Sequence, residues 1–237
     1  MANIILPGED RGLNRRSFFK VAGFGAAAIA AMTVAGCEDD DNNVVTPANT
    51  IDLGSGNTGV LNYAYALEQL EAAFYEKVVA TGTATGLSTE EMALFTDIKN
   101  HEVIHREFFL KALGTTNAKT LTAAQVNFSS INFNNRQSIL NTAMAFEDLG
   151  VSAYNGAGKY LSDPNLLLAA GKIVSVEARH AAIIRDLMVP RSNAAGSFAG
   201  DDVVTVSQGL DVVREPSAVL AIANNYLNVK LTANNIK

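Results

Sequence analysis

The sequence predicts an all-α protein in which four long helices form a bundle with one long crossover between the second and third helices. Three observations carry this prediction. Four stretches between residues 58 and 190 repeat apolar residues at helical spacing. Short loops join the first helix to the second and the third to the fourth, so each pair should be antiparallel. The segment 115–133 is long enough to run back along the bundle.

Local signals set the helix boundaries. Ser88 followed by Glu91 forms a capping box at the start of the second helix. Asp163 caps the fourth helix, and Pro164 occupies its first position. The four helices are predicted over residues 58–79, 88–113, 134–161 and 164–189, with a short C-terminal helix over 216–227 in an extension that spans 191–237.

The first 36 residues predict a secretion signal. Arg15-Arg16 precedes an apolar stretch that is too short and too rich in Gly and Ala for a membrane span. This start resembles a twin-arginine export signal. The run from Val34 to Cys37 resembles a bacterial lipobox, which implies cleavage before Cys37 and lipid on its thiol; a plain signal with an incidental Cys is the alternative. Residues 37–57 are acidic at first and predict a flexible tether.

Composition narrows the classes of function. The net charge is −6 and no basic stripe is present, so we expect no nucleic-acid partner. Cys37 is the single cysteine, which excludes an internal disulfide and a cysteine-bound zinc or iron–sulfur site. A lipid anchor at Cys37 would attach an exported protein to the membrane, so we expect a bacterial envelope protein, periplasmic or at the cell surface.

Apart from Glu71, six carboxylate and imidazole side chains interrupt the apolar stripes of the four helices. A buried unpaired carboxylate costs several kcal/mol, and several in one core cannot all stay ionised without cations. Two divalent metals would neutralise four carboxylates. A Glu at position i and a His at i+3 lie about 60° apart around a helix, so both reach one metal pair. The six residues are Glu68, Glu102, His105, Glu147, Glu177 and His180.

The same half-motif occurs twice, in matching order. Each half has a Glu, a Tyr seven residues later, and then a helix that carries E-x-x-H. A pseudo-twofold dimetal site requires such a repeat. The halves read Glu68, Tyr75, Glu102, His105 and then Glu147, Tyr154, Glu177, His180.

With these motifs, residues 58–190 resemble the ferritin-like di-iron carboxylate superfamily, whose sites combine a Glu from each of two helices with E-x-x-H from each of the other two. With its export signal, the chain resembles more narrowly the exported ferritin-like proteins grouped with desiccation-related proteins. The resemblance implies two iron ions, and manganese or zinc would also suit oxygen and nitrogen ligands. It implies Glu68 and Glu147 as terminal ligands, Glu102 and Glu177 as bridges, one metal on each of His105 and His180, and Tyr75 and Tyr154 as partners of the ligands.

The sequence leaves the role of Glu71 open. It lies on the same stripe as Glu68 and would be a seventh ligand, a substitute for Glu68, or a solvated group. The expected function is an envelope-anchored dimetal protein that oxidises Fe(II) or consumes peroxide or dioxygen, with a small oxidant as partner. A homodimer is compatible with the sequence.

Two other functions compete with this reading. The run His101-Glu102-Val103-Ile104-His105 matches the H-E-x-x-H helix of zinc peptidases. That reading lacks a downstream third ligand and leaves the second E-x-x-H unexplained. The other alternative is a metal-free structural or interaction bundle on the cell envelope.

Overall fold

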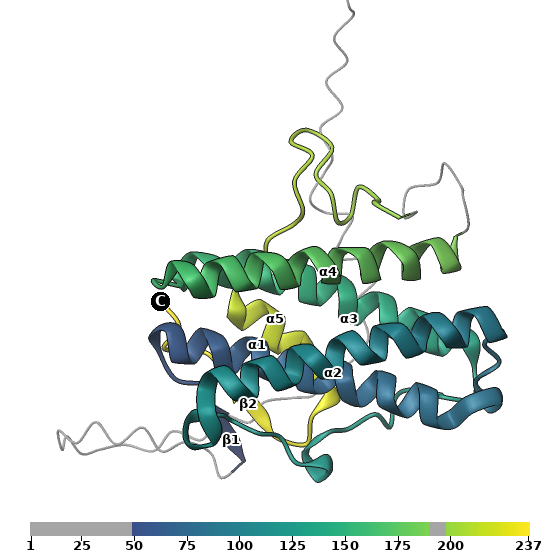
Figure 1. Cartoon of the computed structure of the whole chain (residues 1–237), viewed down its shortest axis with the longest axis horizontal. Helices are drawn as coiled ribbons and strands as arrows, with labels where there is room; N and C mark the ends of the chain where they lie inside the picture. Colours follow the sequence, from purple (N-terminus) through teal and green to yellow (C-terminus); the bar gives the residue numbers. More distant parts are fainter. Residues whose placement is uncertain (1–48, 190–197) are drawn as a thin grey trace, which may run out of the picture. The chain divides into compact units, whose positions relative to one another are not determined.

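The structure, a computed structural model, describes residues 49–189 and 198–237 (Figure 1). Cys37 and the expected secretion signal lie outside the described residues. Within the described ranges, no helix combines the length and apolar character needed to cross a membrane. The predicted all-α fold is confirmed: the helices are α1 (Gly56–Thr81), α2 (Thr89–Asn117), α3 (Arg136–Ala157), α4 (Pro164–Met188) and the short α5 (Pro216–Ala223), and the strands are β1 (Thr50–Asp52) and β2 (Lys230–Thr232).

The helices form two hairpins, α1–α2 and α3–α4, and local signals place their ends. The side chain of Ser88 accepts a hydrogen bond from the Glu91 N–H, and the Glu91 carboxylate accepts one from the Ser88 N–H, as the capping box predicts. Asp163 caps α4 and Pro164 opens it. Gly114 breaks α2 with a φ of 67°, and one further turn follows it.

The segment 118–135 runs back along α1 and joins the two hairpins (Figure 1). Gln69 of α1 accepts a hydrogen bond from the Leu121 N–H and donates one to the Lys119 carbonyl. These contacts satisfy backbone groups of a segment that has no regular structure there. Farther on, Phe128 enters the aromatic core between α1 and α3. The expected crossover is therefore tied to α1 by a buried side chain.

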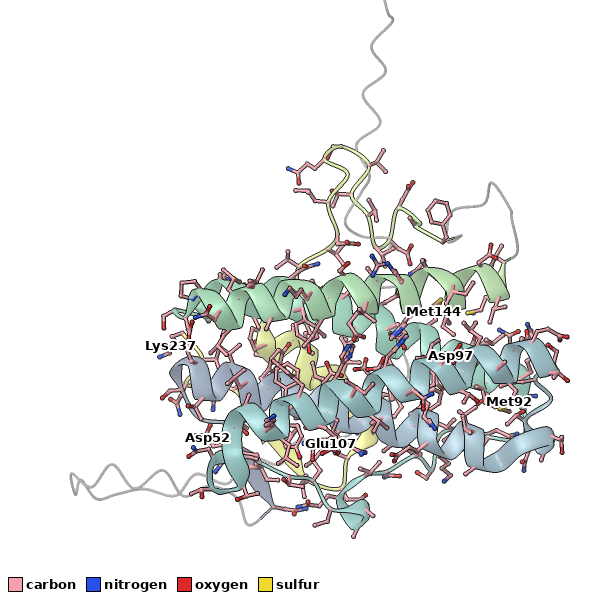
Figure 2. All side chains as sticks on the ribbon, viewed as in Figure 1. Asp52, Met92, Asp97, Glu107, Met144 and Lys237 are labelled. Carbon is pink, nitrogen blue, oxygen red and sulfur yellow. The ribbon has the colours of Figure 1, made fainter. Side chains whose placement is uncertain are left out.

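The C-terminal residues cover the α1–α3 side of the bundle. Val219 and Leu220 of α5 are buried in one apolar cluster with Leu67 of α1 and Leu149 of α3. Because this helix and the crossing segment both cover α1, most of α1 is buried. By contrast α2 exposes charged side chains such as Asp97 and Glu107 (Figure 2).

The tail also meets the start of the fold. Strand β2 pairs in parallel with β1, with Ile51 opposite Leu231, and Leu53 is fully buried. The fold thus includes residues 50–57, which the sequence predicted as the end of a tether. A three-residue parallel strand depends on a partner far along the chain, so local pattern gives little sign of it.

An ion-pair network around a buried arginine ties the segment 198–215 to the second hairpin. Arg185 of α4 is 2% exposed. Its guanidinium donates to both carboxylate oxygens of Asp148 on α3, at 2.9 and 2.6 Å. It also donates to both oxygens of Asp202, at 3.1 and 2.8 Å. Two-pronged Arg–carboxylate pairs fix geometry as well as charge.

Candidate metal centre

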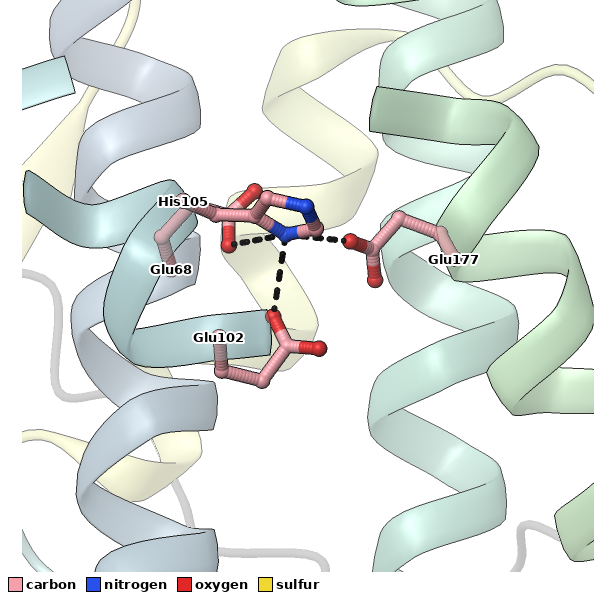
Figure 3. A group of neighbouring side chains, drawn as sticks. All are labelled: Glu68, Glu102, His105 and Glu177. Atoms are coloured by element: carbon pink, nitrogen blue, oxygen red, sulfur yellow. Dashed lines mark ion pairs between the residues drawn. The ribbon is translucent and has the colours of Figure 1, made fainter. Parts of the chain in front are cut away.

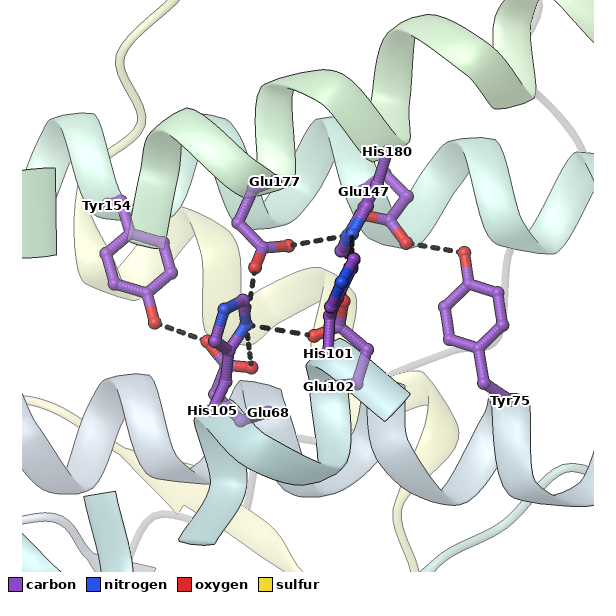
Figure 4. Close-up of polar contacts among 9 residues, drawn as sticks. All are labelled: Glu68, Tyr75, His101, Glu102, His105, Glu147, Tyr154, Glu177 and His180. Carbon is purple, nitrogen blue, oxygen red and sulfur yellow. Dashed lines mark hydrogen bonds and ion pairs between the residues drawn. The ribbon is translucent and has the colours of Figure 1, made fainter. Parts of the chain in front are cut away.

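The six side chains predicted from the sequence meet between the four long helices (Figure 4). Each comes from an apolar stripe that faces the bundle interior, which is why helical spacing brings them together. All are buried, and the four carboxylates are 0% exposed. They are Glu68, Glu102, His105, Glu147, Glu177 and His180.

One group of four consists of His105 and three carboxylates around it (Figure 3). Its Nδ1 atom lies 2.9 Å from an oxygen of Glu177, 3.4 Å from one of Glu68 and 3.5 Å from one of Glu102. These carboxylates come from three different helices. One ring nitrogen carries at most one hydrogen, so it cannot serve three acceptors. The convergence indicates a shared centre rather than a set of hydrogen bonds.

A second group of four consists of His180 and three carboxylates around it. Its Nδ1 atom lies 2.8 Å from Glu102, 3.4 Å from Glu147 and 4.0 Å from Glu177. Glu102 and Glu177 therefore belong to both groups. In each, one carboxylate oxygen approaches His105 and the other approaches His180. Two carboxylates that each point one oxygen at either group have the arrangement of bridging ligands.

The donor atoms fit a pair of metal ions. Oxygen and nitrogen ligands lie about 2.0–2.2 Å from such an ion, so neighbouring ligand atoms lie roughly 3 Å apart. Five of the six nitrogen–oxygen distances at the cluster lie between 2.8 and 3.5 Å. Buried polar atoms normally have hydrogen-bond partners, yet both oxygens of Glu102 and of Glu177 have none among the described residues. The same holds for Glu68 Oε2, Glu147 Oε2, His105 Nδ1 and His180 Nδ1.

Two buried tyrosines hold the terminal carboxylates from the opposite hairpin (Figure 4). Tyr75 of α1 donates to Oε1 of Glu147 on α3. Tyr154 of α3 donates to Oε1 of Glu68 on α1. Burial raises the pKa of both phenols, so both keep the proton that they donate. Each bond fixes one oxygen and leaves Oε2 directed at the cluster.

The cluster without metal is a set of coupled proton sites. Burial raises the pKa of Glu68 to about 7. Burial also opposes charge on Glu102, but contacts with the two imidazoles outweigh it and lower the pKa to about 2. Burial would lower the pKa of the imidazoles, yet the surrounding carboxylates raise it to about 12 for His105 and about 10 for His180. Metal ions would therefore have to displace protons.

Glu71 lies beside the cluster and belongs to neither group of four. Its side chain is buried, and burial followed by the charge of Glu177 raises its pKa well above the ordinary value. In the repeat, the matching position on α3 is Gly150. A Cβ there would lie 3.1 Å from Oε1 of Glu71, so the absent side chain makes room for this carboxyl.

His101 lies at the edge of the cluster, on the exposed side of α2. It belongs to neither group, and its Nδ1 lies 2.9 Å from Nε2 of His180. The H-E-x-x-H reading needs His101 and His105 on one metal, with Glu102 outside the ligand set, so this geometry does not favour it. A groove of about 330 Å³ between α2 and α4 reaches the cluster, lined by His101, Ile104, His105, Val176, Arg179 and His180.

The connectivity and the buried cluster define a class: helical bundles that hold carboxylates and histidines in their core. A family model described as a ferritin-like domain matches residues 56–190, and the chain belongs to this ferritin-like family. The match covers α1–α4 and hence every residue of the cluster. No curated protein matches the chain.

Proposed function

We propose that the cluster binds two divalent metal ions, with iron as the native metal, and that the protein uses them to oxidise Fe(II) or to consume peroxide or dioxygen. The observation that carries this proposal is the sharing of Glu102 and Glu177 between two groups of ligand atoms. Four carboxylates balance the charge of two divalent ions. Oxygen and nitrogen donors without sulfur suit iron or manganese, and zinc less specifically.

The residues divide the work in a symmetric way. Glu68 and His105 would hold one metal, Glu147 and His180 the other, and the two shared glutamates would bridge them. Bound iron would supply one electron from each Fe(II). One peroxide molecule takes two electrons and two protons and yields two waters.

The surrounding residues shape access and protonation. The groove between α2 and α4 is wide enough for a small oxidant. The apolar core packed around the cluster limits water. Tyr75 and Tyr154 keep the terminal carboxylates in place. Without metal, burial and the charge of Glu177 raise the pKa of Glu71, so this carboxyl holds a proton beside the cluster.

We place the protein in the bacterial envelope on sequence grounds. Cys37 is the single cysteine and follows the lipobox-like run after a twin-arginine-like start. Export by that route, cleavage before Cys37 and lipid attachment would anchor the ferritin-like domain to the membrane. In this proposal the partners are metal ions, a small oxidant and the lipid bilayer, and a homodimer is compatible with it.

A metal-free bundle is the second candidate. The imidazoles lie 2.8 and 2.9 Å from carboxylates, so protonated histidines would balance part of the buried charge without metal. In that case the protein would be a structural or interaction module. Metal content separates the two functions directly.

The test is metal analysis by mass spectrometry on the full chain, purified in detergent without chelator from cells supplied with iron and manganese. We expect about two metal ions per chain, because the charge of four carboxylates is balanced by two divalent cations. Glu107→Gln, which changes an exposed glutamate of α2, is the matched control and should keep both ions.

Other results would redirect the assignment. About one zinc per chain would favour the H-E-x-x-H reading. No metal, even after anaerobic addition of Fe(II), would favour the metal-free bundle. If two irons are bound, anaerobic Fe(II) protein mixed with peroxide should oxidise two Fe(II) per peroxide, as followed by absorbance.

A further inference from the structure

The two halves of the cluster differ at the residue that precedes each bridging glutamate. On α2 this residue is His101, before Glu102, and on α4 it is Val176, before Glu177. Both line the groove between α2 and α4. The repeat is therefore broken at a position that lines the groove beside the imidazoles.

The contact between His101 and His180 is an aligned hydrogen bond. The two rings are nearly parallel, 7° apart, and their centroids are 5.2 Å apart. The separation of 2.9 Å between Nδ1 of His101 and Nε2 of His180, together with the two ring radii, accounts for that centroid distance. The rings thus lie edge to edge in nearly one plane, where the nitrogen lone pair points at the N–H.

His105 lacks an equivalent partner. Within the part of the chain that the structure describes, its Nε2 makes no hydrogen bond, and the matching side chain across the groove is the aliphatic Val176. Of the two imidazoles, therefore, His180 alone has its outer ring nitrogen, Nε2, hydrogen-bonded to another described side chain. A metal-binding histidine gains orientation and basicity when its other ring N–H is held by an acceptor, and loss of that acceptor typically costs about 10–100-fold in metal affinity.

We infer that His101 is a positioning residue for His180 and makes the metal position of Glu147 and His180 the tighter of the two. This inference rests on the proposed dimetal function. Nδ1 of His180 faces the carboxylates, so a metal there requires the proton to be on Nε2. The Nε2–H of His180 then donates a hydrogen bond to Nδ1 of His101, which requires the ring of His101 to be neutral.

The experiment is an anaerobic calorimetric titration of the metal-free full chain with Fe(II), repeated with Co(II) so that visible absorption reports each site. The variants are His101→Leu and His101→Asn, whose new side chains have nearly the same shape. The Asn Oδ1 takes the place of the His Nδ1 as an acceptor, whereas Leu removes it. We expect the wild type to bind two ions with unequal Kd values.

His101→Leu should weaken the tighter ion by about 10–100-fold and leave the weaker one unchanged. His101→Asn should largely restore the wild-type values and the Co(II) spectrum of the tighter site. The mirror variant Val176→Asn supplies an acceptor on the side of His105 and should tighten the weaker ion.

The outcomes separate this inference from the proposed function. Two ions bound by His101→Leu with wild-type Kd values would overturn the inference and leave the dimetal site standing. Equal weakening of both ions would also overturn it, since it would indicate a general effect on the bundle. A wild type that binds no Fe(II) or Co(II) would overturn both. Helix content of metal-free His101→Leu by circular dichroism should match the wild type, because the residue is exposed.

Discussion

The hairpins α1–α2 and α3–α4 carry the same ligand pattern but use the next residue along the chain differently. After Glu68, Gln69 binds the crossing segment through its amide. After Glu147, Asp148 pairs with Arg185, which also holds Asp202 of the segment 198–215. Ligand positions repeat because the centre needs the same groups twice. The adjacent positions face whichever segment covers that hairpin, so they are free to differ.

Two more differences lie against the cluster itself. Glu71 on α1 faces Gly150 on α3, so one side carries an additional carboxyl where the other carries no side chain. His101 and Val176 differ in the same way at the groove. One difference lies toward α5 and the other toward the groove, so the pseudo-twofold symmetry holds for the ligands and fails on both sides of them.

The largest expected effect on metal binding comes from the two glutamates that belong to both groups of four. Glu102→Ala with Glu177→Ala removes both shared carboxylates and should abolish binding of both metals, as measured by metal analysis. Helix content by circular dichroism should stay largely unchanged, because the helices keep their apolar stripes. Unchanged metal stoichiometry in this double variant would sink the assignment of the site.

The next largest effect is on stability and concerns the residues that follow the two terminal ligands, Gln69 after Glu68 and Asp148 after Glu147. Arg185→Met leaves Asp148 without its buried partner and should lower the free energy of unfolding by about 3 kcal/mol. Gln69→Leu removes the bonds to the crossing segment and should cost about 1–2 kcal/mol. Urea unfolding of the metal-free protein measures both, with the exposed Glu107→Gln as control. Equal losses in the free energy of unfolding would contradict the expectation that the ion pair of Asp148 stabilises its hairpin more than the amide contacts of Gln69 stabilise theirs.

A separate effect concerns the protons that both halves hold without metal. The pKa values of His105 and His180 rise from an ordinary 6.5 to about 12 and about 10. Above pH 6.5 the folded protein therefore holds more protons than the unfolded chain, and stability from these pairs is lost as the pH rises toward those values.

The Tm of the metal-free protein should accordingly fall between pH 7 and pH 9, as measured by calorimetry. The metal-loaded protein should lack this fall, because its imidazoles are already deprotonated. Metal loading at pH 7 should also release protons into weak buffer. Parallel pH curves for the two forms would count against protonated imidazoles in the metal-free cluster.

Much of the fold could be predicted because its signals are local. Apolar stripes at helical spacing predicted the helices, and the capping box at Ser88 and the pair Asp163-Pro164 predicted where two of them begin. Polar residues on the apolar stripes predicted the cluster. The pairing of β1 with β2 and the contact of His101 with His180 depend on distant parts of the chain. Arg185 also left little sign, because the eight residues that separate it from Glu177 rotate it by about 80° away from that glutamate around the helix.

Each hairpin lends one glutamate to the group centred on the other hairpin's histidine. Two identical hairpins meeting about a twofold axis would therefore assemble the same ligand set, and a chain half as long would suffice as a pair of copies. Joining the halves in one chain adds something that such a pair lacks. Once covalently linked, the halves can diverge independently, and unlike neighbours such as His101 and Val176 become available to an otherwise symmetric centre.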